Sequence, residues 1–268
     1  MKKRILWISI SVVLVIIAAV AIPLSIYFSG SGDDPVDHPS QLSAGVTNEE
    51  GVFTSWEDLI TQEAIQIDDK KPMVLGKCDQ NLSGELVVPD GITTIGMDAF
   101  ITCQKLTRIV LPDSVEVLGL DSFYNCINLE EVVISNTSSL KEIGYGAFTY
   151  CHKLKTLNIP ATVTKIEESA FIGCTALDNI TLPASMDVIP SHLFKDCESL
   201  KEFHHGTLKT IENYAFYNCR SLTSFDFTGV ESIGETAFYG CDSLTHISLP
   251  NTVKVLDKQA FKECLYLD

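Results

Sequence analysis

The chain has 268 residues and a formal net charge of −16, from 35 acidic and 19 basic side chains. An acidic surface repels the phosphate backbone of DNA and RNA, so the composition argues against nucleic acid as a partner. The length allows one extended domain together with shorter terminal segments.

The N-terminus joins three basic residues at positions 2–4 to an apolar run over residues 5–28. As a helix this run would be roughly 36 Å long, enough to cross a bilayer core of about 30 Å. The basic flank predicts a cytoplasmic N-terminus with the rest of the chain outside. A cleaved signal peptide, which would release a secreted protein, is the alternative, because residues 19–21 fit a small-x-small cleavage site. We expect residues 1–28 to be an uncleaved, single-pass signal-anchor.

Two short segments follow this predicted anchor. Residues 29–51 are rich in Gly, Ser, Asp and Pro and lack periodicity, which predicts a flexible linker. In residues 52–83, Ser55 can cap a helix start while Asp58 reaches back to it. Residues 65–67 alternate like a strand. We expect residues 52–83 to cap the repetitive region that follows, because terminal repeats need a cover.

Residues 84–268 repeat eight times with a period near 23 residues. Each repeat carries a phenylalanine and, three positions later, a cysteine. These pairs are Phe100 and Cys103, Phe123 and Cys126, Phe148 and Cys151, Phe171 and Cys174, Phe194 and Cys197, Phe216 and Cys219, Phe238 and Cys241, and Phe261 and Cys264. A period of this length lies in the range of leucine-rich repeats.

One repeat, Leu106–Cys126, shows the expected local structure. Ile109 and Leu111 alternate like a strand, and Pro112 ends that strand because proline has no N–H to donate to a sheet. A second short extended piece follows, and residues 121–126 are expected to form a single helical turn. A lone repeat cannot bury its apolar edge, so neighbouring repeats must stack into one continuous core.

The repeats share the pattern I-x-L-P-x-x-V-x-x-I-G-x-x-A-F-x-x-C-x-x-L, and Val163–Cys174 and Val253–Cys264 match it well. This pattern resembles the BspA-like (treponemal-type) leucine-rich repeats. We therefore expect an α/β, β-rich repeat solenoid. It would be a right-handed leucine-rich-repeat superhelix with a short parallel strand and one helical turn in each repeat. Repeat five departs from the pattern at Phe203, His205 and Gly206, and we expect irregular stacking there. Members of this class are commonly surface proteins that bind host or matrix proteins, so the resemblance implies a binding function.

The cysteines are expected to be structural. Eight of the nine occupy one position of successive repeats and should form an inward-pointing ladder. Neighbouring Cα atoms would be about 5 Å apart, but parallel Cβ vectors oppose disulfide bonds. Zinc would need convergent cysteine pairs, which the spacing does not provide. We expect the Phe and Cys ladders to be core, with no metal, redox or cofactor role.

Parallel strands should line the concave face of the solenoid, where the side chains that point away from the core form two columns. The first column is Glu85, Arg108, Glu131, Thr156, Asn179, Glu202, Ser224 and His246. The second is Val87, Val110, Val133, Asn158, Thr181, His204, Asp226 and Ser248.

The two ends of these columns differ in character. The three valines predict an exposed apolar stripe beside a Glu–Arg–Glu row, which is a candidate contact surface. The alternative is that β-branched residues simply suit strands. At the other end, His204, Asp226 and His246 could form a metal or pH-sensitive patch. The alternative there is an ordinary solvated face.

These features predict a membrane-anchored extracellular protein whose concave face binds, or adheres to, a host, matrix or cell-surface protein. The alternative is a self-assembling structural protein. The sequence stops at residues 267–268, where another repeat should begin, and an uncapped end of this kind predicts self-association. The sequence contains no Walker loop, HExxH, GxSxG or dinucleotide motif, so we expect no enzyme activity. Glycosylation sequons begin at Asn81, Asn136 and Asn179 and matter only in a glycosylating host.

Overall fold

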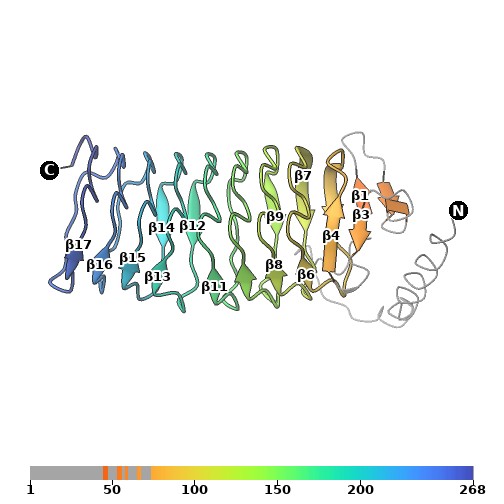
Figure 1. Ribbon diagram of the computed structural model, residues 1–268, viewed down its shortest axis with the longest axis horizontal. Coiled ribbons are helices and arrows are strands. Elements are labelled where there is room, and N and C mark those ends of the chain that lie inside the picture. The colour runs from red at the N-terminus through yellow and green to blue at the C-terminus, as the bar shows by residue number, and fades with distance from the viewer. Residues whose placement is uncertain (1–44, 48–52, 56–57, 60–64, 68–73, 268) are drawn as a thin grey trace, which may run out of the picture.

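The computed structural model describes residues 45–47, 53–55, 58–59, 65–67 and 74–267. It is a parallel β-solenoid of about eight turns, here called coils and numbered one to eight by their phenylalanines from Phe100 to Phe261. The coils lie side by side along an axis that is nearly straight in this view (Figure 1). The anchor predicted over residues 5–28 lies outside the described residues. In the part of the chain that is described, no helix has the length and hydropathy needed to span a bilayer.

The coils contribute two rows of short parallel strands, and coils four, seven and eight have an assigned strand only in the second row. The first row contains β5 (Ser83–Val87), β7 (Lys105–Val110), β9 (Glu131–Val133), β12 (Asn179–Thr181) and β14 (Glu202–His204). The second row contains β4 (Val74–Cys78), β6 (Thr94–Ile95), β8 (Val117–Leu118), β10 (Glu142–Ile143), β11 (Lys165–Ile166), β13 (Val188–Ile189), β15 (Thr210–Ile211), β16 (Ser232–Ile233) and β17 (Val255–Leu256).

The segment before the coils adds antiparallel strands to both rows. Strand β1 (Gly45–Thr47) pairs with β2 (Phe53–Ser55) and with β5, and β3 (Ile65–Ile67) pairs with β4. Each row therefore has an antiparallel strand at its N-terminal edge, a position that would otherwise expose unpaired backbone groups. Strand β1 lies within the segment predicted to be a flexible linker, so that segment includes a paired strand. The predicted helix cap at Ser55 is present, because its hydroxyl accepts the Asp58 N–H at 3.2 Å.

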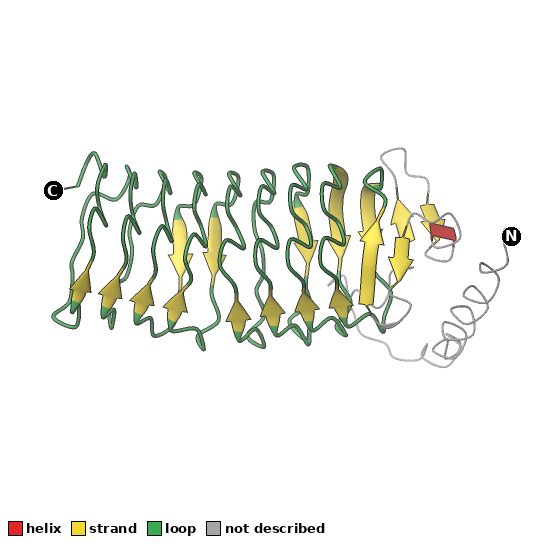
Figure 2. Ribbon diagram, viewed as in Figure 1, coloured by secondary structure: helices red, strands yellow, loops and turns green. Residues whose placement is uncertain are grey.

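The predicted helical turn is wrong, and a run of tight turns takes its place (Figure 2). In coil two, Asp121 and Asn125 have φ angles of 50° and 59°. The residues two positions before and two positions after the phenylalanine have positive φ in all eight coils. An α-helix needs successive residues near φ −63°, so left-handed residues placed every four positions exclude it. The described coils are thus β-strands joined by turns, without the α component of the predicted α/β class.

These turns create a third row of hydrogen bonds between coils. The Phe123 N–H donates to the Ala147 carbonyl of the next coil at 2.8 Å, and the residues two positions to either side make the same kind of bond. The intervening Tyr124 N–H donates back to the Asp121 carbonyl at 3.0 Å. Alternate N–H groups therefore close the turn and bond the neighbouring coil, so the buried backbone donors of this segment are satisfied. We call this third row the turn column.

The phenylalanines form a continuous stack at the centre of the solenoid. Neighbouring rings are 5.1–5.6 Å apart between centroids, and seven of the eight side chains, from Phe100 to Phe238, are fully buried. Offset stacking at this distance is a favourable aromatic geometry. Phe261 in the last described coil is only partly buried.

The cysteines line this core and act as hydrogen-bond donors. The Cys126 thiol donates to the Phe100 carbonyl at 3.0 Å, and each later ladder cysteine makes the same bond to the phenylalanine of the preceding coil at 3.1–3.2 Å. All nine cysteines are free. Burial raises the pKa of Cys103 and of Cys174 to about 12, so these thiols keep the proton that makes a thiol a donor.

The second row is interrupted at Pro190. In coils two to four, the residue four positions before the phenylalanine donates its N–H to the preceding coil, as Gly144 does to Leu118 at 2.8 Å. Pro190 has no N–H to give to Ile166. Among the described strands, β11 therefore ends one sheet and β13 begins another.

The interruption does not coincide with Phe203–Gly206, where the sequence predicts irregular stacking. Beside Phe203 the rings of Phe194 and Phe216 are tilted by 24°, whereas the other neighbouring rings of the stack are within 10° of parallel. Strand β14 pairs in register with β12 through Phe203 and Ile180. The Phe203 ring is buried and packs against Phe216 with centroids 4.9 Å apart, so a larger apolar side chain fills the core in place of the usual isoleucine. The core accommodates phenylalanine in place of isoleucine at this position because an aromatic side chain buries a large area.

Candidate functional site

The side chains of the two predicted columns lie on one surface, which we call the first-strand face. Backbone pairing aligns Glu85 with Arg108 and Arg108 with Glu131, and it aligns Thr181 with His204. Side chains of one column are therefore about 4.8 Å apart from coil to coil. This regular spacing places chemically different groups side by side on a hydrogen-bonded backbone.

A three-residue ion network occupies the N-terminal part of this face. The Arg108 guanidinium binds Glu85 through Nη1 and Glu131 through Nε, the latter at 2.7 Å. Burial disfavours the charge, but hydrogen bonding to Glu131 and the charge of Glu85 outweigh it, so the pKa of Arg108 lies above its ordinary value. One cation thus fixes two carboxylates in position.

We expect Arg108→Ala to lower the unfolding free energy by about 1 kcal/mol, because it removes two partly exposed ion pairs and leaves two carboxylates facing one another. Urea denaturation would measure the change. Lys141→Ala is the matched control, since its pair with Glu116 is more exposed, and it should change stability by less than about 0.5 kcal/mol. A loss above about 3 kcal/mol for Arg108→Ala would show that the network is structural rather than a surface feature.

The valines of the second column are not the exposed stripe that the sequence predicts. Val87 is 8% exposed and Val110 is 1% exposed, while Val133 is half-buried. Val110 has a valine on each neighbouring strand and Arg108 two residues away on the same face, so neighbours on three sides shield it. The apolar third of the first-strand face therefore offers little surface to a partner.

The remainder of the first-strand face is exposed and polar. Its exposed residues are Thr156, Asn158, Asn179, Thr181, Glu202, His204, Ser224, Asp226, His246 and Ser248. Four of these ten side chains make hydrogen bonds within the chain, among them Asn179, whose amide donates to Asp178 at 2.6 Å, and His246, whose Nδ1 lies 3.0 Å from the Thr245 hydroxyl. The Asn158 amide donates to Asn136 at 2.9 Å, and His204 Nε2 lies 3.7 Å from Glu202 Oε2. Most of their hydrogen-bonding capacity faces solvent.

The structure does not assemble the predicted patch of His204, Asp226 and His246 into a metal site. No three metal-ligating side chains come together anywhere in the described part of the chain. The Asp226 carboxylate instead accepts the Thr228 N–H at 2.9 Å, and the hydrogen bonds from Thr228 lower the pKa of Asp226. These three residues belong to the solvated face.

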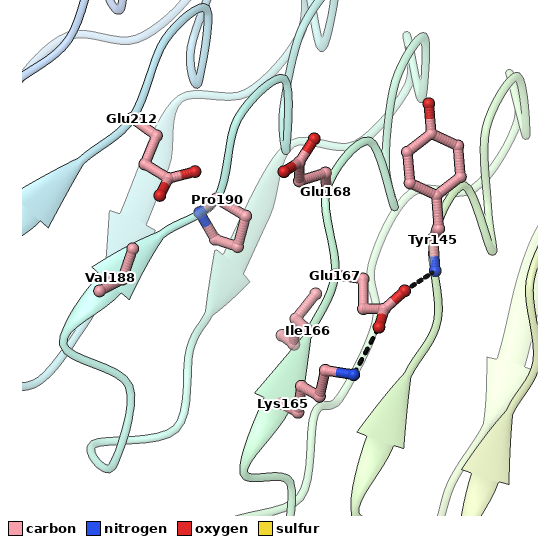
Figure 3. A pocket seen from close by; sticks show the side chains of 8 residues that line it. All are labelled: Tyr145, Lys165, Ile166, Glu167, Glu168, Val188, Pro190 and Glu212. Atoms are coloured by element: carbon pink, nitrogen blue, oxygen red, sulfur yellow. Dashed lines mark hydrogen bonds and ion pairs between the residues drawn. The ribbon is translucent and has the colours of Figure 1, made fainter.

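A groove lies on a different side of the solenoid, at the interruption of the second row (Figure 3). Its volume is about 440 Å³. The residues that line it are Tyr145, Lys165, Ile166, Glu167, Glu168, Val188, Pro190 and Glu212. None of these residues was a predicted site residue.

Comparison with known proteins identifies the repeat. The family model described as the BspA type leucine rich repeat region matches residues 78–201 and 202–268, in six copies. The chain belongs to the BspA-type leucine-rich-repeat family. Proteins built from such repeats are generally non-enzymatic binding scaffolds, and BspA-type proteins are typically found at the cell surface.

Two solved structures show the same architecture as this BspA-type chain. A leucine rich cell surface protein from Faecalibacterium prausnitzii A2-165 is 26% identical, with 76% of this chain and 51% of that chain covered and a TM-score of 0.55. A leucine-rich repeat protein from Bacteroides ovatus ATCC 8483 is 26% identical, with 71% and 64% covered and a TM-score of 0.53. The chain therefore spans less than two thirds of either structure. No curated protein matches it.

In this BspA-type chain, the residue four positions before the phenylalanine changes in type at the coils that form the groove. Four positions before the phenylalanine, coils one to three carry glycine, whereas coils four to six carry Glu167, Pro190 and Glu212. A Cβ at Gly119 would lie 2.8 Å from the backbone of the preceding coil, so that position has no room for a side chain in the regular stack. Glu167 and Glu212 nevertheless keep the N–H bond to the preceding coil, at 2.9 Å each, so of these three residues only Pro190 interrupts the row.

Proposed function

We propose that this BspA-type protein is displayed at the cell surface and binds a protein ligand through the exposed part of its first-strand face. The observation that carries the proposal is the pair of exposed polar columns from Thr156 to Ser248. Family membership supports a binding scaffold, and the similar structure from Faecalibacterium prausnitzii is described as a cell surface protein. The ligand class is a host, matrix or cell-surface protein.

The exposed side chains of β12 and β14 are pre-organised for binding. Strands β12 and β14 hold Asn179 beside Glu202 and Thr181 beside His204, so these side chains are already in register before a ligand arrives. Binding to a surface that is already ordered costs less conformational entropy than ordering a mobile loop. Amide, hydroxyl, carboxylate and imidazole groups at strand spacing can hydrogen-bond a polar protein surface.

Attachment to the membrane is a second part of the proposal. The apolar run over residues 5–28, preceded by three basic residues, would hold the chain as a single-pass anchor with the coils outside. Display at a surface puts the first-strand face in reach of external proteins. Secretion after signal cleavage remains the alternative, as does self-association through the last coil.

The test compares two triple variants of the full chain on a panel of purified extracellular matrix proteins immobilised for biolayer interferometry. Asn158→Arg, Thr181→Arg and Glu202→Arg together place three bulky cations on the first-strand face. The matched control carries Glu116→Arg, Glu235→Arg and Asp257→Arg, away from that face. We expect the first triple variant to weaken binding at least tenfold and the control to bind normally. Equal binding by both folded variants would contradict the proposal.

A further inference from the structure

We infer that a second surface, at the corner between the second row and the turn column, binds an extended segment of a partner protein. We call it the corner surface, and it comprises Met97, Leu120, Tyr145 and the groove at Pro190. Apolar side chains of the segment would cover the first part, and a lysine or arginine would enter the groove. This inference does not depend on the first-strand face.

The first part of the corner surface is an exposed apolar stripe. Met97, Leu120 and Tyr145 occupy the same position in coils one to three and are 63%, 40% and 44% exposed. Backbone hydrogen bonds hold these positions on adjacent coils. The Asp98 N–H, next to Met97, donates to the Leu120 carbonyl at 3.0 Å, and the Asp121 N–H, next to Leu120, donates to the Tyr145 carbonyl at 2.8 Å. A contiguous stripe of large apolar side chains on an acidic protein is a feature that marks interaction sites.

The stripe leads directly into the groove. Tyr145 is both the last member of the stripe and a wall of the groove, and Glu168 takes the same position in coil four. The groove has apolar lining from Ile166, Val188 and Pro190. Since Pro190 cannot donate to Ile166, the carbonyl of Ile166 lacks the coil-to-coil bond that the equivalent residues accept. The groove therefore combines an apolar wall with a backbone acceptor.

The charged side chains that line the groove favour a cationic ligand. Its lining contains three carboxylates, from Glu167, Glu168 and Glu212, and one ammonium, from Lys165. Lys165 is engaged already, because it pairs with Glu142 at 2.9 Å and with Glu167. The uncompensated charge is negative, which favours a cationic ligand.

Two of the carboxylates are held in place by the backbone of the preceding coil. Glu167 accepts the Tyr145 N–H at 3.1 Å, and Glu212 accepts the N–H of Ser191 at 2.9 Å and its hydroxyl at 3.0 Å. Glu168 and Glu212 lie on either side of Pro190 (Figure 3). A lysine or arginine can lay its aliphatic stem against the proline and bring its charged end to these carboxylates.

The dimensions favour a protein segment over an isolated cation. Coil spacing places the groove roughly 14–19 Å from Met97, which an extended chain covers in about four to six residues. The described residues contain no cluster of three ligands that would hold a metal ion. We therefore expect a segment in which two or three apolar residues are followed, after a few positions, by lysine or arginine.

The probe for this inference is a phage-displayed library of random 12-residue peptides, selected on the full chain. Enriched peptides would be synthesised with a fluorescent label and titrated by anisotropy. We expect them to share the apolar-then-basic pattern. Their affinity should fall at least tenfold with the double substitution Glu168→Gln and Glu212→Gln, and also with Leu120→Ser. Glutamine at position 212 can still accept from Ser191, so the fold should be retained, as circular dichroism would show.

The matched controls are Glu235→Gln, which occupies the equivalent position of Glu168 three coils later, and Leu265→Ser, an exposed leucine elsewhere. Both should leave the affinity unchanged, and so should the triple variant on the first-strand face. The absence of enriched peptides, or enriched peptides that bind the double variant normally, would overturn the inference. Calorimetric binding of calcium alone that is lost in the double variant would also overturn it, by identifying a cation site.

Discussion

The solenoid is expected to lose stability steeply as the pH rises from 7.5 to 10, because its core contains protonated thiols. An unfolded cysteine has a pKa of about 8.5. Burial raises the pKa of Cys103 and of Cys174 to about 12, and it also raises the pKa of Cys151, Cys197 and Cys219. Above pH 8.5 the unfolded chain therefore releases protons that the folded chain retains, and stability falls with rising pH until the folded pKa is passed.

The size of this effect follows from the number of protons released. Each buried thiol lowers the unfolding free energy by about 1.4 kcal/mol per pH unit above pH 8.5, so Cys103 and Cys174 alone would remove about 4 kcal/mol by pH 10. Urea unfolding under a reductant at several pH values would measure the slope. Cys174→Ala should make the slope shallower by one thiol's contribution. Stability that stays constant from pH 7.5 to 10 would contradict the buried ladder.

Replacing a mid-stack phenylalanine should have the largest effect of any single substitution. Phe171 is fully buried, with ring centroids 5.6 Å from Phe148 and 5.5 Å from Phe194. We expect Phe171→Ala to cost about 3–5 kcal/mol, because it removes a buried aromatic ring and leaves a cavity between two coils. Urea denaturation at pH 7 would measure the loss.

The control for this substitution lies at the last described coil. Phe261 stacks on Phe238 but is only partly buried. Phe261→Ala should therefore cost clearly less than Phe171→Ala, since less buried area is lost. A loss below about 1 kcal/mol for Phe171→Ala would mean that the phenylalanine stack does not hold the coils together.

The core residues of this fold can be predicted from the sequence, whereas the backbone conformation of the turn column is harder to predict. Side chains with a fixed chemical preference, such as Phe171 and Cys174, recur at fixed spacing and lie in the core. The predicted helical turn is wrong because Asp121 and Asn125 adopt positive φ. Since neither residue is a glycine, the sequence of this coil does not point to positive φ at these positions. A hint is present in neighbouring coils, where Gly146 and Gly173 occupy these two positions. In the other coils, hydrogen bonds within the turn and between coils stabilise the conformation, and Asp and Asn adopt positive φ more readily than most other residues.

The surface was harder to predict than the core because exposure depends on neighbours that a single sequence does not place. Alternation correctly assigned Val110 to the side of the strand opposite the main core, but it gave no information on how closely Arg108 and the adjacent valines pack around it. The groove arises from a backbone effect, the missing N–H of Pro190. Pro190 lies in the second row, whereas the predicted contact columns lie in the first row.

Hydroxyl-radical footprinting of the full chain, with and without a matrix protein that it captures, tests the central claim most directly, because it reports side-chain exposure along every face at once. If the ligand binds the first-strand face, His204 and His246 will lose reactivity on binding, while Met97 on the corner surface will keep its own. Protection confined to Met97 and Tyr145, with both histidines as reactive as in the free protein, would contradict the assignment of ligand binding to the first-strand face.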